Sequence, residues 1–198
     1  MSRINPYIAA LLLLLLLLSA CGSSPPVRYY GLNAIESIAV NDPDGSPVIA
    51  MGPFRMPEYL NRSQMVTYGA NSELLVDDLS RWAEPLDDAV HRILASNVDI
   101  LLTSAAVVAY PAAALLDVDY RLVGRIARFN ADQSGLVVLE MQWAAGDSDG
   151  NQLLAPTRKR YDSQATDAGS PGSIARAMSE ALEKASRDIA KEIESAIK

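Results

Sequence analysis

The pattern of apolar residues in the second half of the chain restricts the fold more than any other feature of the sequence. Between residues 117 and 163, apolar and polar side chains alternate with the period of two that is typical of half-buried strands. A polar turn at 147–151 separates the last two predicted strands. One apolar face contains Val118, Tyr120, Leu122 and Ile126, and the next contains Val137, Leu139, Met141, Trp143 and Ala145. These segments predict an antiparallel meander with one buried side and one solvent-facing side.

A long amphipathic helix is predicted to follow the meander. Ser170 and Pro171 are typical of an N-cap and a first helical turn. Apolar residues then recur at steps of three and four up to Ile197. An earlier segment, 85–97, has the same helical spacing. We expect Trp82, just before it, to pack on the start of that helix.

Shorter β-branched and aromatic segments at 27–32, 48–54 and 64–68 predict additional strands. Two helices can cover one face of such a sheet. The sequence therefore predicts an α+β fold, a two-layer sandwich with a mostly antiparallel sheet and two main helices on one face.

The first 21 residues have the layout of an export signal. Arg3 precedes an uninterrupted apolar run, 8–18, which is too short to span a bilayer. The ending Leu-Ser-Ala-Cys resembles the bacterial lipobox, in which the cysteine receives diacylglycerol and an N-acyl chain. The alternative is that Cys21 is an ordinary residue at a soluble-protein cleavage site. We predict a lipoprotein signal peptide at 1–20, a lipidated tether at 21–26 and a single domain at 27–198.

Lipidation at Cys21, by palmitate and similar chains, predicts stable anchoring, since two or three acyl chains hold a protein on a membrane. Gly22 stands where an aspartate would favour retention in the inner membrane, so the outer membrane is expected. The short tether, 22–26, reaches at most about 17 Å. The domain is therefore expected at the inner leaflet of the outer membrane, facing the periplasm.

Charge and composition exclude several classes of function. The net charge of −7 argues against nucleic-acid binding, which depends on clustered lysine and arginine. It also disfavours adhesion to anionic lipid headgroups by charge alone. One cysteine and one histidine exclude a disulfide framework and a cysteine-based zinc site, so no metal and no dissociable cofactor are expected.

No catalytic constellation is predicted. The sequence contains no Gly-x-Ser-x-Gly, Walker or Gly-x-Gly-x-x-Gly motif. The pairs at 77–78 and 87–88 are interpreted as solvent-facing charge, and His91 as a solvated helix residue. The basic triplet 158–160 is interpreted as a solvent-facing strand, with a docking patch as the alternative. The chain is therefore expected not to be an enzyme.

Two segments are candidates for contacts with a partner. The segment 100–116 carries no charge, so it forms either a core strand or an interface between proteins. The proline-containing segment 52–66 is either an interface loop or a tight loop pinned by an arginine ion pair. The candidate partner-binding residues are Phe54, Tyr59, Leu60, Arg62 and Tyr110.

Three strings of residues resemble one family. They are Tyr29-Tyr30-Gly31-Leu32, the segment from Gly52-Pro53 to Val66, and Arg81-Trp82-Ala83-Glu84-Pro85-Leu86. These strings, in the same order along the chain, are similar to those of the PqiC-type lipoproteins, also called ABC-type transport auxiliary lipoproteins. Asn61 and Ser63 depart from the family, which often has aspartate and proline there.

This resemblance implies a non-enzymatic outer-membrane component of an intermembrane lipid transport system. Its partners would be a tunnel-forming MCE-domain protein and, through it, an inner-membrane permease. We expect the domain to form a homo-oligomer, a ring that docks the tunnel to the membrane. The alternatives are a scaffold or assembly lipoprotein of another outer-membrane machine, and a carrier that itself encloses lipid.

Overall fold

The computed structural model describes residues 25–36, 47–115 and 117–197, together with Tyr7. The predicted cleavage site, Cys21 and the whole apolar run 8–18 lie outside the described residues. No helix in the described part of the chain is both long enough and apolar enough to span a membrane.

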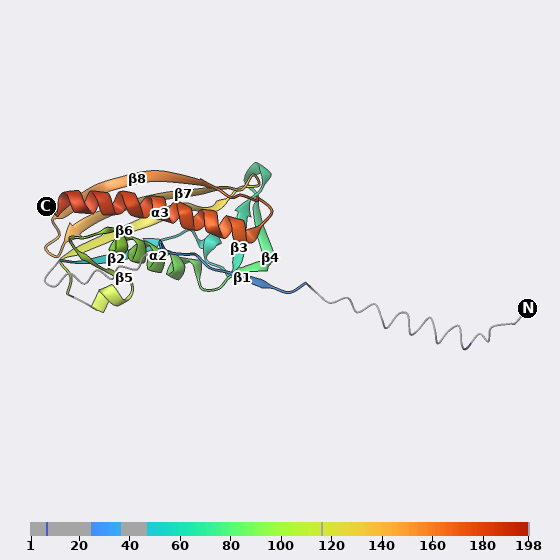
Figure 1. The fold of residues 1–198 in the computed structure, drawn as a ribbon, viewed down its shortest axis with the longest axis horizontal. Helices are drawn as coiled ribbons and strands as arrows, with labels where there is room; N and C mark the ends of the chain where they lie inside the picture. The colour runs from blue at the N-terminus through green and yellow to red at the C-terminus, as the bar shows by residue number, and fades with distance from the viewer. Residues whose placement is uncertain (1–6, 8–24, 37–46, 116, 198) are drawn as a thin grey trace, which may run out of the picture.

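A five-stranded mixed sheet forms the larger layer (Figure 1). Across the sheet its strands are β5 (Ala106–Ala109), β2 (Val48–Arg55), β6 (Tyr120–Ala131), β7 (Leu136–Asp147) and β8 (Gln152–Gln164). The last three pair antiparallel, which confirms the predicted meander. By contrast, β2 lies parallel to both of its neighbours.

A second, three-stranded sheet lies at one end of the molecule (Figure 1). It contains β1 (Arg28–Tyr30), β4 (Leu74–Trp82) and β3 (Gln64–Tyr68) in that order. The central strand β4 pairs parallel with β1 and antiparallel with β3. An isolated bridge between Tyr68 and Asp132 joins this sheet to the end of β6. The strand β4 was not predicted, because 74–79 has neither helical nor alternating periodicity.

Two long helices cover the same face of the larger sheet, as Figure 1 shows. They are α2 (Leu86–Leu101) and α3 (Pro171–Ala196). At the start of α3, the Ser170 hydroxyl accepts a hydrogen bond from the Ser173 amide, as expected for an N-cap. Three short 3-10 helices, η1 (Glu58–Leu60), η2 (Ala70–Ser72) and η3 (Ala112–Leu115), lie in the connections. The predicted fold class, α+β with two helices on one face, is confirmed.

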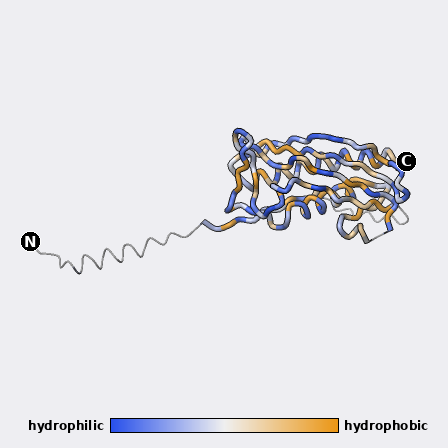
Figure 2. The backbone as a smooth tube through the Cα atoms, turned by 180° about the vertical axis from the view of Figure 1, so that it is seen from behind, coloured by the Kyte–Doolittle hydropathy of each residue, from blue (hydrophilic) through white to orange (hydrophobic). Residues whose placement is uncertain are grey.

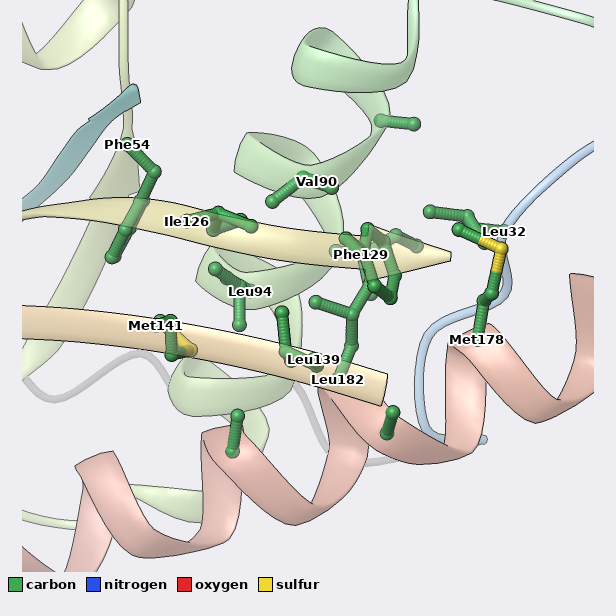
Figure 3. Close-up of a cluster of buried hydrophobic side chains, with 14 of the residues drawn as sticks. Leu32, Phe54, Val90, Leu94, Ile126, Phe129, Leu139, Met141, Met178 and Leu182 are labelled. Carbon is green, nitrogen blue, oxygen red and sulfur yellow. The ribbon is translucent and has the colours of Figure 1, made fainter. Parts of the chain in front are cut away.

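The main core lies between the helices and the larger sheet (Figure 3). Leu94 of α2, Leu139 of β7 and Leu182 of α3 are fully buried there. The face of α3 that packs inward is rich in alanine, for example Ala181 and Ala185, both at 0% exposure. Small side chains allow a helix to approach its neighbours closely, so the alanines support the close packing of this layer.

Candidate functional site

The segment 52–66 includes both core and surface residues. Phe54 and Leu60 are 2% and 3% exposed and belong to the main core. Both were predicted to contact a partner, but in this structure they are buried too deeply for a partner to reach them. Tyr59 is half-buried, whereas Arg62 is exposed. Arg62 forms no ion pair with any of the described residues, so this part of the chain gives no support to a loop pinned by that arginine.

His91 corrects one prediction. It is 7% exposed rather than solvated, and its Nε2 accepts a hydrogen bond of 2.7 Å from the Phe54 amide. The ring of His91 lies between the rings of Phe54 and Tyr110, with centroid distances of 6.0 and 5.6 Å. Gly52 leaves the space for it, because a Cβ there would lie 2.9 Å from His91 Cδ2. The prediction failed because His91 lies on the buried face of α2, where its ring accepts a hydrogen bond from the end of β2.

The structure explains why β2 needs this acceptor. Strand β5 pairs only with Val48–Met51, so that edge of β2 has no strand partner at Phe54. A buried backbone amide without an acceptor is destabilising. His91 supplies the acceptor from the neighbouring helix.

Tyr59 and Tyr68 meet at the junction of the two sheets, with ring centroids 6.2 Å apart. The guanidinium carbon of Arg128 lies 4.6 Å above the Tyr68 ring, in a cation–π arrangement. Burial is the main cause that raises the pKa of the Tyr59 hydroxyl. These contacts fix the inner part of the loop and give Tyr59 a structural role.

The uncharged segment 100–116 is partly a strand, as one of its two interpretations predicted. Residues 106–109 form β5, whose side chains are only half-buried because it is an outer strand of the larger sheet. Tyr110 follows and is 41% exposed. An interface at this edge therefore stays a prediction for Tyr110.

The first part of β4 is the most exposed apolar segment among the described strands, and sequence reasoning missed it. We call Leu74–Leu79 the β4 patch. Its apolar side chains Leu74, Leu75, Val76 and Leu79 are 38, 36, 40 and 41% exposed. On one side the patch pairs with β3, but β1 pairs only with Ser80–Trp82. The other side of the patch therefore has no strand partner among the described residues.

A hollow of about 490 Å³ adjoins the β4 patch. Its lining combines residues of the patch with Met65 of β3 and with Pro171 and Ile174 at the start of α3. Asp77 and Asp78 give the patch negative charge, and both are exposed, as predicted. An apolar strand edge with acidic side chains and a neighbouring hollow is suited to binding another protein segment.

The basic triplet 158–160 divides between the two faces of β8. Arg158 and Arg160 are exposed, as the solvent-facing interpretation predicted. Lys159 instead faces α3, and its Nζ lies 3.0 Å from both Asp188 Oδ2 and Glu192 Oε1. The part of the chain that the structure describes contains no group of three histidine, cysteine or acidic residues placed to hold a metal.

Comparisons with known proteins agree with this fold. A family model described as an ABC-type transport auxiliary lipoprotein component matches residues 30–190. No curated protein matches the chain. A crystal structure of an uncharacterized protein superposes with a TM-score of 0.71 at 19% identity, covering 85% of this chain and 99% of the other. Protein XCC0632 from Xanthomonas campestris gives 0.60 at 18% identity, covering 82% and 92%.

Proposed function

Because the chain belongs to the family of ABC-type transport auxiliary lipoproteins, we propose that it is a lipid-anchored, non-enzymatic adaptor of an MCE-type intermembrane lipid transport system. Acyl chains on Cys21 would hold it in the inner leaflet of the outer membrane, with the domain in the periplasm. There it would dock an MCE-domain tunnel protein, which connects to an inner-membrane permease. Self-association into a ring would give the tunnel a symmetric seat.

The observation that supports an adaptor is the β4 patch. One edge of the patch has no strand partner among the described residues and offers backbone hydrogen bonds, and the exposed leucine and valine side chains offer apolar contact area. A partner strand that pairs with this edge would form the backbone hydrogen bonds and cover the apolar side chains at the same time, as in β-augmentation. Asp77 and Asp78 favour a partner segment with lysine or arginine beside its apolar residues.

Site-specific crosslinking tests the partner. A photoreactive amino acid at Leu75 in the full chain, in envelope membranes, is expected to capture the MCE-domain protein. The same amino acid at Arg187, exposed on α3, is the matched control and is expected not to do so. Capture only of components of a different outer-membrane machine would instead support a scaffold lipoprotein.

Substitution tests the energetics of the same patch. Burial of a leucine side chain at an interface is worth about 1.5–3 kcal/mol. We therefore expect Leu75→Asp to weaken co-purification with the MCE-domain protein at least about tenfold. Val27→Asp, at a residue 38% exposed outside the β4 patch, is the control. Equal co-purification of both variants would contradict a role for the patch.

Two further measurements test the anchor and the ring. Intact-mass analysis is expected to show a chain that begins at Cys21 and carries acyl groups, and an unmodified cysteine would refute the anchor. Light scattering of the purified full chain is expected to show an oligomer. A strict monomer at micromolar concentration, alone and with the partner, would contradict the ring.

A further inference from the structure

The face of the larger sheet that the helices leave uncovered carries an unusual set of arginines. Figure 2 shows the molecule from this side, with hydrophilic segments along the strands. We define the arginine face as the outward, exposed residues Arg55 of β2, Arg121 and Arg125 of β6, and Arg158 and Arg160 of β8. Acidic residues near this face include Glu140 and Asp162, which lie close to the arginines of β8, and Asp119, which precedes Arg121 by two residues and whose Oδ2 accepts a hydrogen bond from the Val48 amide.

Strand register places three of these arginines in one row. Arg55 pairs directly with Arg125, which pairs with Gln142, which pairs with Arg158. Neighbouring strands are about 4.8 Å apart, so the row spans roughly 15 Å. Like charges directly opposite each other on a sheet are destabilising. Arg55 and Arg125, on neighbouring strands, therefore repel each other, and an anion bound between them would relieve this repulsion.

Little within the described residues neutralises this row. Arg55, Arg121 and Arg125 form no ion pair there, and Arg158 has only a distant contact with Glu140, at 3.6 Å. Arg160, beyond the row, is paired with Asp162 at 2.8 Å. The positive charge is thus concentrated at the row and at Arg121.

An apolar floor lies between these arginines. A shallow hollow of about 480 Å³ is lined by Arg55 and Arg125 together with Pro53, Val123, Ala144 and Pro156. Val123 is one of the most exposed large apolar residues of the domain, at 44%. Cationic groups around an apolar floor match a ligand with a phosphate and a hydrocarbon part.

We propose that the arginine face binds the phosphate groups of anionic phospholipids at the surface of a bilayer. The overall charge of −7 does not prevent this, because salt screens charges beyond about 10 Å and the local charge dominates. A broad, open sheet face fits a planar array of phosphates better than a single ligand. The short predicted tether after Cys21 would keep the domain within reach of the headgroups. This proximity is the one part of the proposal that rests on the proposed anchor.

Chemical footprinting of the unmodified full chain tests the proposal. The purified protein is reconstituted into vesicles of phosphatidylcholine alone, or of phosphatidylcholine and phosphatidylglycerol in equal amounts. Phenylglyoxal then modifies exposed arginines, and mass spectrometry gives the rate at each position. Arg92, Arg176 and Arg187, exposed and on the two helices, are internal controls.

One arginine at an anionic bilayer surface is worth a factor of about five in the docking equilibrium. We therefore expect Arg55, Arg125 and Arg158 to react at least about fivefold more slowly in the phosphatidylglycerol vesicles than in phosphatidylcholine alone. High salt should abolish the difference, and the helix arginines should not change. Equal rates at Arg55, Arg125 and Arg158 in the two vesicles would overturn the proposal.

A variant separates the arginine face from general charge. In the chain with Arg55→Gln and Arg125→Gln, protection of Arg158 by phosphatidylglycerol should fall several-fold. The chain with Arg176→Gln and Arg187→Gln has the same net charge and should keep it. Protection in native envelope membranes but not in phosphatidylglycerol vesicles would show that an acidic protein covers this face, and would refute lipid binding.

Discussion

The hydrogen bond between His91 and the Phe54 amide makes a quantitative prediction. His91→Phe keeps an aromatic ring between Phe54 and Tyr110 but removes the Nε2 acceptor. The amide would then be buried without a partner at the point where β5 no longer pairs with β2. An unsatisfied buried donor is destabilising by about 1–3 kcal/mol.

Urea unfolding and thermal unfolding, each followed by far-UV circular dichroism, measure the changes in the free energy of unfolding and in Tm. For a chain of this size 1 kcal/mol corresponds to roughly 2–4 °C in Tm. We therefore expect Tm of His91→Phe to fall by about 2–12 °C. Tyr110→Phe changes a neighbouring, 41% exposed ring and should leave stability unchanged. If His91→Phe unfolds at the wild-type urea concentration, or if both variants lose the same stability, the hydrogen bond does not hold the end of β2.

Three more substitutions test the packing and the electrostatics. Gly124→Ala should destabilise the fold by about 1–3 kcal/mol, because the new Cβ would overlap the Gln142 carbonyl oxygen and lie 2.9 Å from the Phe54 ring. Gly31→Ala is the control: Gly31 has open space around it, so this variant should be neutral in the same urea titration. Trp82→Ala removes a ring that is 6% exposed and should lose about 3–5 kcal/mol; unchanged stability with weaker partner binding would place Trp82 at an interface instead. Partial burial raises the pKa of the Asp188 carboxyl, but hydrogen bonds from Lys159 and Tyr161 outweigh burial and lower it overall. A carboxyl whose pKa is lower in the folded state stabilises that state at pH values above its unfolded pKa of about 4. This stabilisation is lost as the pH falls below that value. Asp188→Asn should therefore be less stable than wild type at neutral pH, by less than about 1 kcal/mol because the pair is partly exposed, and the difference should vanish in acid.

The meander and the last helix could be predicted because their periodicity follows directly from one buried face. Trp82 is buried at the end of β4 and belongs to the same core cluster as Leu86 of α2, while its packing on the start of that helix stays a prediction. The parallel pairing of β2 could not be predicted, because which strands become neighbours depends on contacts far apart in the sequence. Strand β4 was missed because the residues of the β4 patch are exposed on both faces, so no alternation marks them.

The candidate contact residues show a different limit of sequence reasoning. Arg62 and Tyr110 are at the surface as expected, yet Phe54 and Leu60 are in the core. Prolines around an apolar residue indicate a loop but do not show which way its side chains point. His91 was misjudged for a similar reason, since a histidine that accepts a backbone hydrogen bond has no signature in its neighbours along the chain.

The segment after β1 ties the two ends of the sequence together. The Asn33 amide donates to the Ser179 hydroxyl of α3, 146 residues away, and the Ile35 amide donates to Asn97 Oδ1. Residues 28–36 are therefore held from two directions, by β4 and α2 in the first half of the chain and by α3 close to its other end. The contact at Asn33 can form only once α3 is in place, so a chain truncated before Ser179 would keep the pairing of β1 with β4 but lose this hydrogen bond between the two ends of the sequence.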